Sequence, residues 1–393
     1  SAQEGTGNIA IGAGAIEDPI FSENSIAIGQ DALHKLNNYN SIGIGRDALW
    51  NTTNVPDEAA LIAMGMSNLQ EYIAQTDNAS TSLDESIYGI PGNIAIGSGA
   101  YSSPQTATIS VSQNFSIGNI AIGHMSMNRA SKRTSGNIAI GQQSLPLLET
   151  GGGIISIGNY NLNQLQDGNG TLAIGNGVGK NIEYGRMLTL IGSNVAHNAE
   201  NLTAATAVGL GAMFNAGVAV QNTAFGRQAL RNIGKTLQES GNQYDENGQW
   251  VSYVVSGTSN VAIGPYSLQE TDSGFRNVAV GRSAMINNVD GADNVGIGDR
   301  ALRNNNSNFN TGVGRHTLEN NILGEYNSAI GWYAGSDNNY QNGNSKNTFL
   351  GALSNTVSGS TVENSTALGY AATVTTSNTI QLGDGDIELV NTS

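Results

Sequence analysis

A pattern of apolar, small and apolar positions followed by glycine recurs along the whole chain. Ile138, Ala139, Ile140 and Gly141 form one copy, and the phrase NIAIG also stands at 8–12, 93–97 and 119–123. Alignment on the glycine gives twenty copies, and nine of the nineteen intervals are 17 residues. A fixed period of this length predicts stacked coils rather than separate globular domains. The repeat glycines are Gly12, Gly29, Gly45, Gly65, Gly97, Gly123, Gly141, Gly158, Gly175, Gly192, Gly209, Gly226, Gly264, Gly281, Gly298, Gly314, Gly331, Gly351, Gly369 and Gly383.

The three positions before each glycine predict a short strand with two different faces. The first and third positions, such as Ile138 and Ile140, are mostly β-branched or aliphatic, and they share a face because strand side chains alternate. The middle position is Ala, Gly or Ser in 17 of twenty copies. A strand face open to water would favour larger residues such as Thr. We therefore expect both faces to be buried, with the small residues against a neighbouring chain.

The residues after each glycine predict how the coil closes. An apolar residue follows four positions later, as in Leu145, Leu268 and Leu302, and we expect a tight turn that brings it under the strand. Segments rich in Asn and Gly, such as 303–310, suit turns with positive φ. One coil holds about three buried apolar side chains, worth roughly 1.5–3 kcal/mol each. That is too little to order 17 residues alone. The sequence thus predicts an all-β fold, a parallel β-solenoid of about twenty coils.

Composition and charge exclude several classes of protein. Glycine supplies 52 of 393 residues but follows no three-residue period, and Pro is scarce at 6, so collagen is excluded. The formal net charge of -15 disfavours nucleic acid and anionic membrane surfaces as partners. There is no Cys, and no apolar run approaches the ~20 residues of a membrane span. We expect no membrane insertion within this chain.

The repeated phrases resemble those of a known family. NSIAIG at 24–29, NSIGIG at 40–45 and NSTALGYAAT at 364–373 look like the head repeats of trimeric autotransporter adhesins, the YadA-like family, and the likeness extends from about Asn8 to Leu382. The resemblance implies a left-handed parallel β-roll and an intertwined or side-by-side homotrimer. Heads of that family repeat nearer 14 residues, so the 17-residue period implies a longer corner here.

The resemblance also implies a function. It indicates a non-enzymatic, extracellular fibre or adhesin that attaches to a host or surface receptor, with glycans among the candidates. The alternative is a phage or phage-derived tail fibre, because 377–393 resembles the stretch that precedes a self-releasing C-terminal chaperone in fibre proteins. An enzyme on the same scaffold is the third and least favoured reading.

Insertions into the repeat are the candidate binding sites. We expect one repeat domain over 1–393, with insertions at 66–92, 101–117 and 231–259; a short helix is expected in the first. In the third, Asn247-Gly248 predicts a hairpin turn. Its aromatic residues either bind a sugar or receptor or cover the side of the roll. The candidate ligand-binding residues are Tyr244, Trp250, Tyr253, Tyr72 and Tyr88.

No pattern in the chain favours catalysis, a metal or a cofactor. GNGVGK at 175–180 resembles a phosphate-binding loop, but Gly175 is a repeat glycine and the residue after Lys180 is neither Ser nor Thr. The four histidines, among them His197 and His316, lie far apart, and Asp residues lack the spacing of a calcium loop. We predict no catalytic residue, no metal site and no cofactor.

Overall fold

The computed structural model describes most of the repeat strands and nearly all of the chain after residue 134. The chain forms two compact units, Ser1–Leu188 and Thr189–Ser393, which we describe in turn. The described residues are 7–16, 22–23, 25–32, 38–39, 42–46, 94–98, 100, 118–130, 134–235, 238–244, 250–254, 257–336, 343–359 and 361–385.

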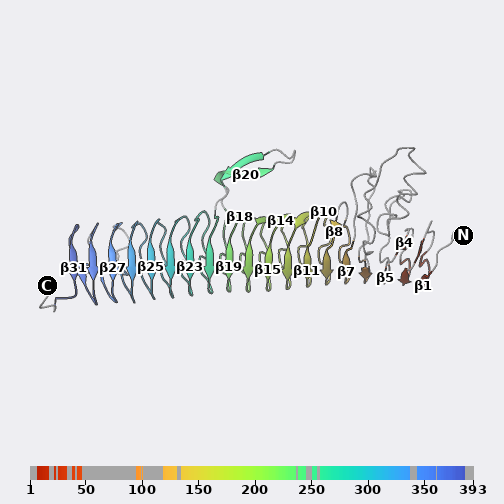
Figure 1. Ribbon diagram of the computed structural model, residues 1–393, viewed down its shortest axis with the longest axis horizontal. Helices are drawn as coiled ribbons and strands as arrows, with labels where there is room; N and C mark the ends of the chain where they lie inside the picture. Colours follow the sequence, from red (N-terminus) through yellow and green to blue (C-terminus); the bar gives the residue numbers. More distant parts are fainter. Residues whose placement is uncertain are drawn as a thin grey trace. The chain divides into compact units, whose positions relative to one another are not determined.

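In the first unit, short parallel strands from successive repeats pair side by side (Figure 1). Equivalent positions stand opposite one another, so that Ile138 pairs with Ile120 and with Ile155. The ladder consists of β1 (Ile9–Ile11), β3 (Ile26–Ile28), β5 (Ile42–Ile44), β6 (Ile94–Ile96), β7 (Ile120–Ile122), β9 (Ile138–Ile140), β11 (Ile155–Ile157) and β13 (Leu172–Ile174). A second parallel set holds β8 (Thr134–Ser135), β10 (Thr150–Gly152), β12 (Asp167–Asn169) and β14 (Tyr184–Arg186), and β2 (Ser22–Glu23) pairs with β4 (Asn38–Tyr39).

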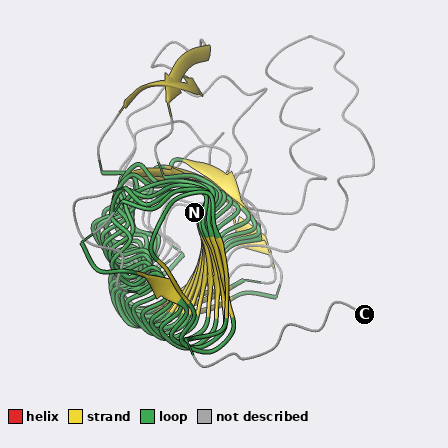
Figure 2. Cartoon of the chain, turned by 90° about the vertical axis from the view of Figure 1, so that its left-hand side faces the viewer, coloured by secondary structure: helices red, strands yellow, loops and turns green. Residues whose placement is uncertain are grey.

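The second unit repeats the same ladder. Its strands are β15 (Thr189–Ile191), β17 (Thr206–Val208), β19 (Thr223–Phe225), β22 (Val261–Ile263), β23 (Val278–Val280), β24 (Val295–Ile297), β25 (Thr311–Val313), β26 (Ser328–Ile330), β27 (Thr348–Leu350), β29 (Thr366–Leu368) and β31 (Ile380–Leu382). Shorter parallel pairs join β16 (Asn201–Thr203) to β18 (Val218–Val220) and β28 (Asn355–Thr356) to β30 (Thr373–Val374). Strands form only a small part of each coil, and turns form the rest (Figure 2).

This architecture confirms the parallel β-solenoid and corrects the number of coils. The part of the chain that the structure describes is built from strands and turns without a helix. Nineteen strands stand in the ladder, and the described residues make about fifteen turns rather than the expected twenty. The repeat expected at Gly65 and the insertions at 66–92 and 101–117, with the helix predicted there, lie outside the described residues.

The expected orientation of the strand faces is wrong. The small middle residue points into the coil: Ala139, Ala262 and Ala279 are fully buried within the chain. The aliphatic residues on either side point outward and stay partly exposed, as Ile155 and Ile157 show at 36% each. The interior is narrow at this point, because a Cβ added to Gly296 would lie 2.9 Å from Met285 Cε. The small column therefore faces the chain's own core and not a neighbouring chain.

Each corner depends on backbone conformations with positive φ. Gly331 has φ of +136°, and a Cβ there would lie 2.7 Å from the carbonyl oxygen of Gly351 in the next coil, so only glycine fits. The second and fourth residues after the repeat glycine are also left-handed, for example Arg300 at 57° and Leu302 at 51°. The turn brings Leu302 fully into the interior, as the sequence predicts. Backbone hydrogen bonds to the next coil continue through the corner, with Leu302 N 2.8 Å from Thr317 O.

A ladder of buried asparagines runs beside the strands of the second unit. From Asn222 to Asn347, the residue four before the repeat glycine accepts a hydrogen bond through Oδ1 from the backbone N–H of its equivalent one coil later. Asn294 Oδ1, for example, lies 2.9 Å from Asn310 N. Such hydrogen bonds satisfy backbone groups that would otherwise be unpaired in the core. The ladder comprises Asn222, Asn260, Asn277, Asn294, Asn310, Asn327 and Asn347.

The hairpin predicted in the third insertion is present. Strands β20 (Gln238–Tyr244) and β21 (Trp250–Val254) pair antiparallel, with Tyr244 opposite Trp250. The coil ladder continues across the insertion, because β19 pairs directly with β22. The insertion thus leaves the stacking of the coils intact.

Candidate functional site

The outward positions of the repeat strands form an exposed apolar strip, which we call the outer strand face. It consists of the first and third residues of each repeat strand, and two columns of side chains follow from the direct register of the strands. In the second unit the third-position column is apolar throughout, whereas Thr or Ser begins seven of the eleven strands. In the second unit, ten strand-to-strand steps of about 4.8 Å give these columns a length of about 48 Å. The large side chains with at least 36% exposure are Phe225, Ile263, Ile297, Ile330, Leu350, Leu368, Ile380 and Leu382. A contiguous apolar strip of this length is unusual on the free surface of a protein and marks an interaction site.

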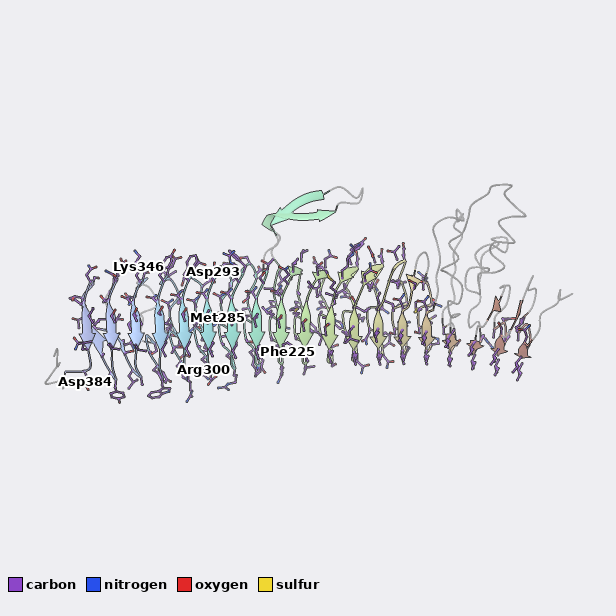
Figure 3. The ribbon with its side chains drawn as sticks, in the orientation of Figure 1. Phe225, Met285, Asp293, Arg300, Lys346 and Asp384 are labelled. Carbon is purple, nitrogen blue, oxygen red and sulfur yellow. The ribbon has the colours of Figure 1, made fainter. Side chains whose placement is uncertain are left out.

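Arginine and aromatic residues border this face in the second unit, at the corner that follows each repeat glycine. We call this border the arginine–aromatic corner; it comprises Arg227, Tyr266, Arg282, Arg300, Arg315, Trp332 and Tyr370. Five of these residues stand directly after the glycine, where the strand alternation continues outward, so their column adjoins the outer strand face; Tyr266 and Arg300 stand one residue further on. Arg300 projects along the same edge of the coils as Phe225, whereas Asp293 and Lys346 lie along the opposite edge (Figure 3).

One carboxylate joins two arginines of this corner. Asp299 Oδ1 lies 3.1 Å from Arg282 Nε, and Asp299 Oδ2 lies 3.3 Å from Arg282 Nη2 and 3.5 Å from Arg315 Nε. The hydrogen bonds from Arg282, followed by its positive charge, lower the pKa of Asp299. Asp299 therefore stays ionised at neutral pH and holds Arg282 in place.

Aromatic rings of successive coils stack face to face elsewhere on the second unit. Such stacking fits a solenoid, because equivalent side chains are one strand spacing apart. Phe309 and Tyr326, exposed by 45% and 52%, have ring centroids 4.8 Å apart and an angle of 8° between their planes. His316 stacks on Tyr333 at 4.4 Å, and His197 stacks on Phe214 at 5.3 Å.

His316 is the most buried of the described titratable groups near this corner. Its ring is 2% exposed, and Nδ1 lies 2.5 Å from Glu319 Oε2. Its Nε2 is buried without a hydrogen-bond partner in the described part of the chain. Because Nε2 is covered, this pair cannot reach a substrate. Within the described ranges, no three His, Asp or Glu side chains gather where they could hold a metal ion.

The structure does not test the sequence-predicted site residues. The register places Tyr244 opposite Trp250 and Tyr253 opposite Gly241, but the hairpin's side chains lie outside the described set, as do Tyr72 and Tyr88. Their role in binding stays a prediction.

Sequence reasoning missed Trp332, Tyr370 and Arg315. The alternation of side chains along the strand, extended to the first residue after the repeat glycine, would have predicted that these side chains point outward. That prediction also requires knowing which face of the strand is the outer one.

Comparison with known proteins finds no protein-family model, no curated protein and no solved structure that matches this chain. In the described residues, no helix is long and apolar enough to cross a membrane. The fold class is therefore defined by the structure alone, as a parallel β-solenoid.

Proposed function

We propose that the chain is the repeat region of a non-enzymatic, extracellular fibre of the adhesin type, which assembles as a homotrimer of left-handed β-rolls. In this proposal the outer strand face of each chain packs against the same face of its siblings. The observation that carries the proposal is that the apolar third-position column is exposed although its register is regular along the ladder. The resemblance of the repeats to YadA-like adhesin heads supports an assembly of three chains.

The energetics favour association along this face. Covering the exposed half of one aliphatic side chain contributes about 1 kcal/mol. The third-position column of the second unit holds eleven apolar side chains, so the sum exceeds the several kcal/mol that association costs in lost translational and rotational freedom. Equivalent columns in parallel copies of the chain are self-complementary, because every described ladder strand presents an apolar residue at its third position. The net charge of -15 per chain opposes further, unspecific association between assemblies.

A trimeric fibre has a mechanical and a multivalent role. The coils hold one another through backbone hydrogen bonds, so the scaffold needs no disulfide, and the chain contains no Cys. Three copies of each surface group ring such an assembly, and weak contacts to a receptor add as avidity.

The test is the mass of the assembled protein. Light scattering after gel filtration should give about three times the chain mass of 40.7 kDa. The double change Ile297→Lys and Ile330→Lys should yield monomers, because it places charges in the interface. Phe309→Lys with Tyr326→Lys is the matched control, since these residues are equally exposed on other positions of the same coils; it should remain trimeric. A monomeric wild type, or equal masses for both double variants, would contradict the proposal.

A further inference from the structure

Trp332 departs from the stacking that the other aromatic rings follow. Its ring centroid lies 4.7 Å from that of Tyr333, at an angle of 83°. Tyr333 stacks on His316 of the preceding coil, at 13°, so the plane of Tyr333 crosses the direction in which the coils stack. The plane of the Trp332 ring therefore runs along the stacking direction. In this orientation the faces of the ring do not point toward the neighbouring coils, so rings of those coils cannot stack on them. The side chain is 48% exposed.

The column that contains Trp332 holds a second exposed aromatic residue. Trp332, Ala352 and Tyr370 each follow a repeat glycine, and the strands before them pair in direct register. Tyr370 is 66% exposed, and Ala352 places only a methyl group between the two rings. The backbone positions of Trp332 and Tyr370 are two coil steps apart, about 10 Å. We call these three residues the aromatic platform.

A cation without a full set of partners adjoins the platform. Arg315 occupies the same column one coil before Trp332, and its side chain is 59% exposed. Its Nε lies 3.5 Å from Asp299 Oδ2, but Asp299 is already hydrogen-bonded to Arg282. Among the described residues, the two Nη groups of Arg315 have no hydrogen-bond acceptor.

The charge around Arg315 is opposite in sign to that of the chain. Arg282, Arg300 and Arg315 stand near one carboxylate, Asp299, which leaves a local surplus of two positive charges in a chain of net charge -15. An anionic ligand is therefore favoured at this corner over the rest of the surface.

From these observations we infer that the corner binds an acidic sugar, a pyranose that carries a carboxylate, within a surface polysaccharide or glycan. The apolar face of the sugar ring packs on Trp332, and Tyr370 contacts the next residue of the saccharide. The guanidinium group of Arg315 donates hydrogen bonds to the carboxylate, for which its planar fork is suited. This inference rests on the proposed attachment function. The site is nevertheless made by residues of one chain, so loss of trimer assembly and loss of sugar binding can be told apart.

The test is binding of the full chain to immobilised oligosaccharides that contain galacturonate, glucuronate or sialic acid, each beside its methyl ester. The ester keeps the ring and removes the charge. We expect the wild type to bind at least one acidic form about tenfold more tightly than its ester. Trp332→Ala should weaken binding of both forms about tenfold or more, whereas Trp332→Tyr should retain most of the affinity. Arg315→Gln should remove the preference for the acid while binding of the ester persists.

Leu210→Ala is the matched control, because Leu210 follows a repeat glycine in the same column and is 51% exposed. Thermal melting and gel filtration of every variant show whether fold and assembly are intact. The inference is overturned if no acidic sugar binds more tightly than its ester, or if Trp332→Ala and Arg315→Gln bind like Leu210→Ala. It is equally overturned if Trp332→Ala changes the oligomeric state and leaves sugar binding unaltered.

Discussion

Removal of one rung of the asparagine ladder is the sharpest test of how the second unit is held together. In Asn294→Ala, the backbone N–H of Asn310 loses its acceptor, Asn294 Oδ1 at 2.9 Å. A buried donor left unpaired costs about 1–3 kcal/mol. Asn294 Nδ2 also donates to Asn277 Oδ1 at 3.1 Å and to Ser307 O at 2.7 Å, and these two hydrogen bonds contribute about 0.5–1.5 kcal/mol each.

The acceptors of those two bonds stay satisfied, which limits the loss. Asn277 Oδ1 still accepts from the backbone N–H of Asn294, and Ser307 O still accepts from Asn305 Nδ2. The free energy of unfolding should therefore fall by about 2–6 kcal/mol. Asn294→Asp should be worse than Asn294→Ala, because it turns an oxygen toward two acceptors and buries a charge.

The assay combines urea unfolding, followed by circular dichroism, with hydrogen exchange of the backbone amide of Asn310. Local exchange matters because coils of a solenoid can open separately. The matched control is Asn287→Ala, which breaks an exposed side-chain bond to Asn304 Oδ1 at 2.7 Å and should change stability by about 0.5 kcal/mol or less. The reasoning is refuted if Asn294→Ala and Asn287→Ala have the same urea midpoint and the amide of Asn310 exchanges at the wild-type rate.

Three further predictions concern the core, the surface charges and the insertion. Ala139→Leu should destabilise each chain by about 1–3 kcal/mol, because Ala139 is fully buried in the packed interior. Ile140→Val, on the outer strand face, should change the melting temperature of a monomer little. Equal melting temperatures of the two variants would contradict the assignment of faces. The hydrogen bonds from Arg276 lower the pKa of Asp293. This pair therefore stabilises the fold at pH values above 3.8, the ordinary pKa of Asp, and its contribution is lost as the pH falls through the lower pKa of the folded state. Carbon NMR titration should show Asp293 titrating below 3.8, and Arg276→Gln should abolish the shift. Deletion of 238–254 should leave the thermal melting temperature nearly unchanged, since Thr223 pairs directly with Val261, and a large drop would show that the hairpin supports the coils.

The sequence alone determined the repeat, its register and the class of fold. Three-residue strand patterns followed by glycine recur often enough to require stacked parallel strands. The structure pairs Ala139 with Ala121 and with Ser156, as the alignment of the repeats predicts. The leucine four residues after the glycine and the antiparallel hairpin in the third insertion also followed from local patterns. These features depend on interactions between equivalent or neighbouring positions, which a period and a turn signal reveal.

Only the tertiary structure decided which face of the strand is inside. Alternation separates Ile138 and Ile140 from Ala139 but does not say which side the coil encloses, and hydrophobicity favours the wrong answer. The corner brings Leu145 and its equivalents into the interior, and the inward strand position beside them is mostly Ala, Gly or Ser, although Leu190 and Phe349 are also fully buried there. The aliphatic residues are therefore displaced to the outer surface. For the same reason the platform at Trp332 and Tyr370 and the buried hydrogen bonds of Asn294 could not be derived from sequence, because they depend on the direction in which each coil closes.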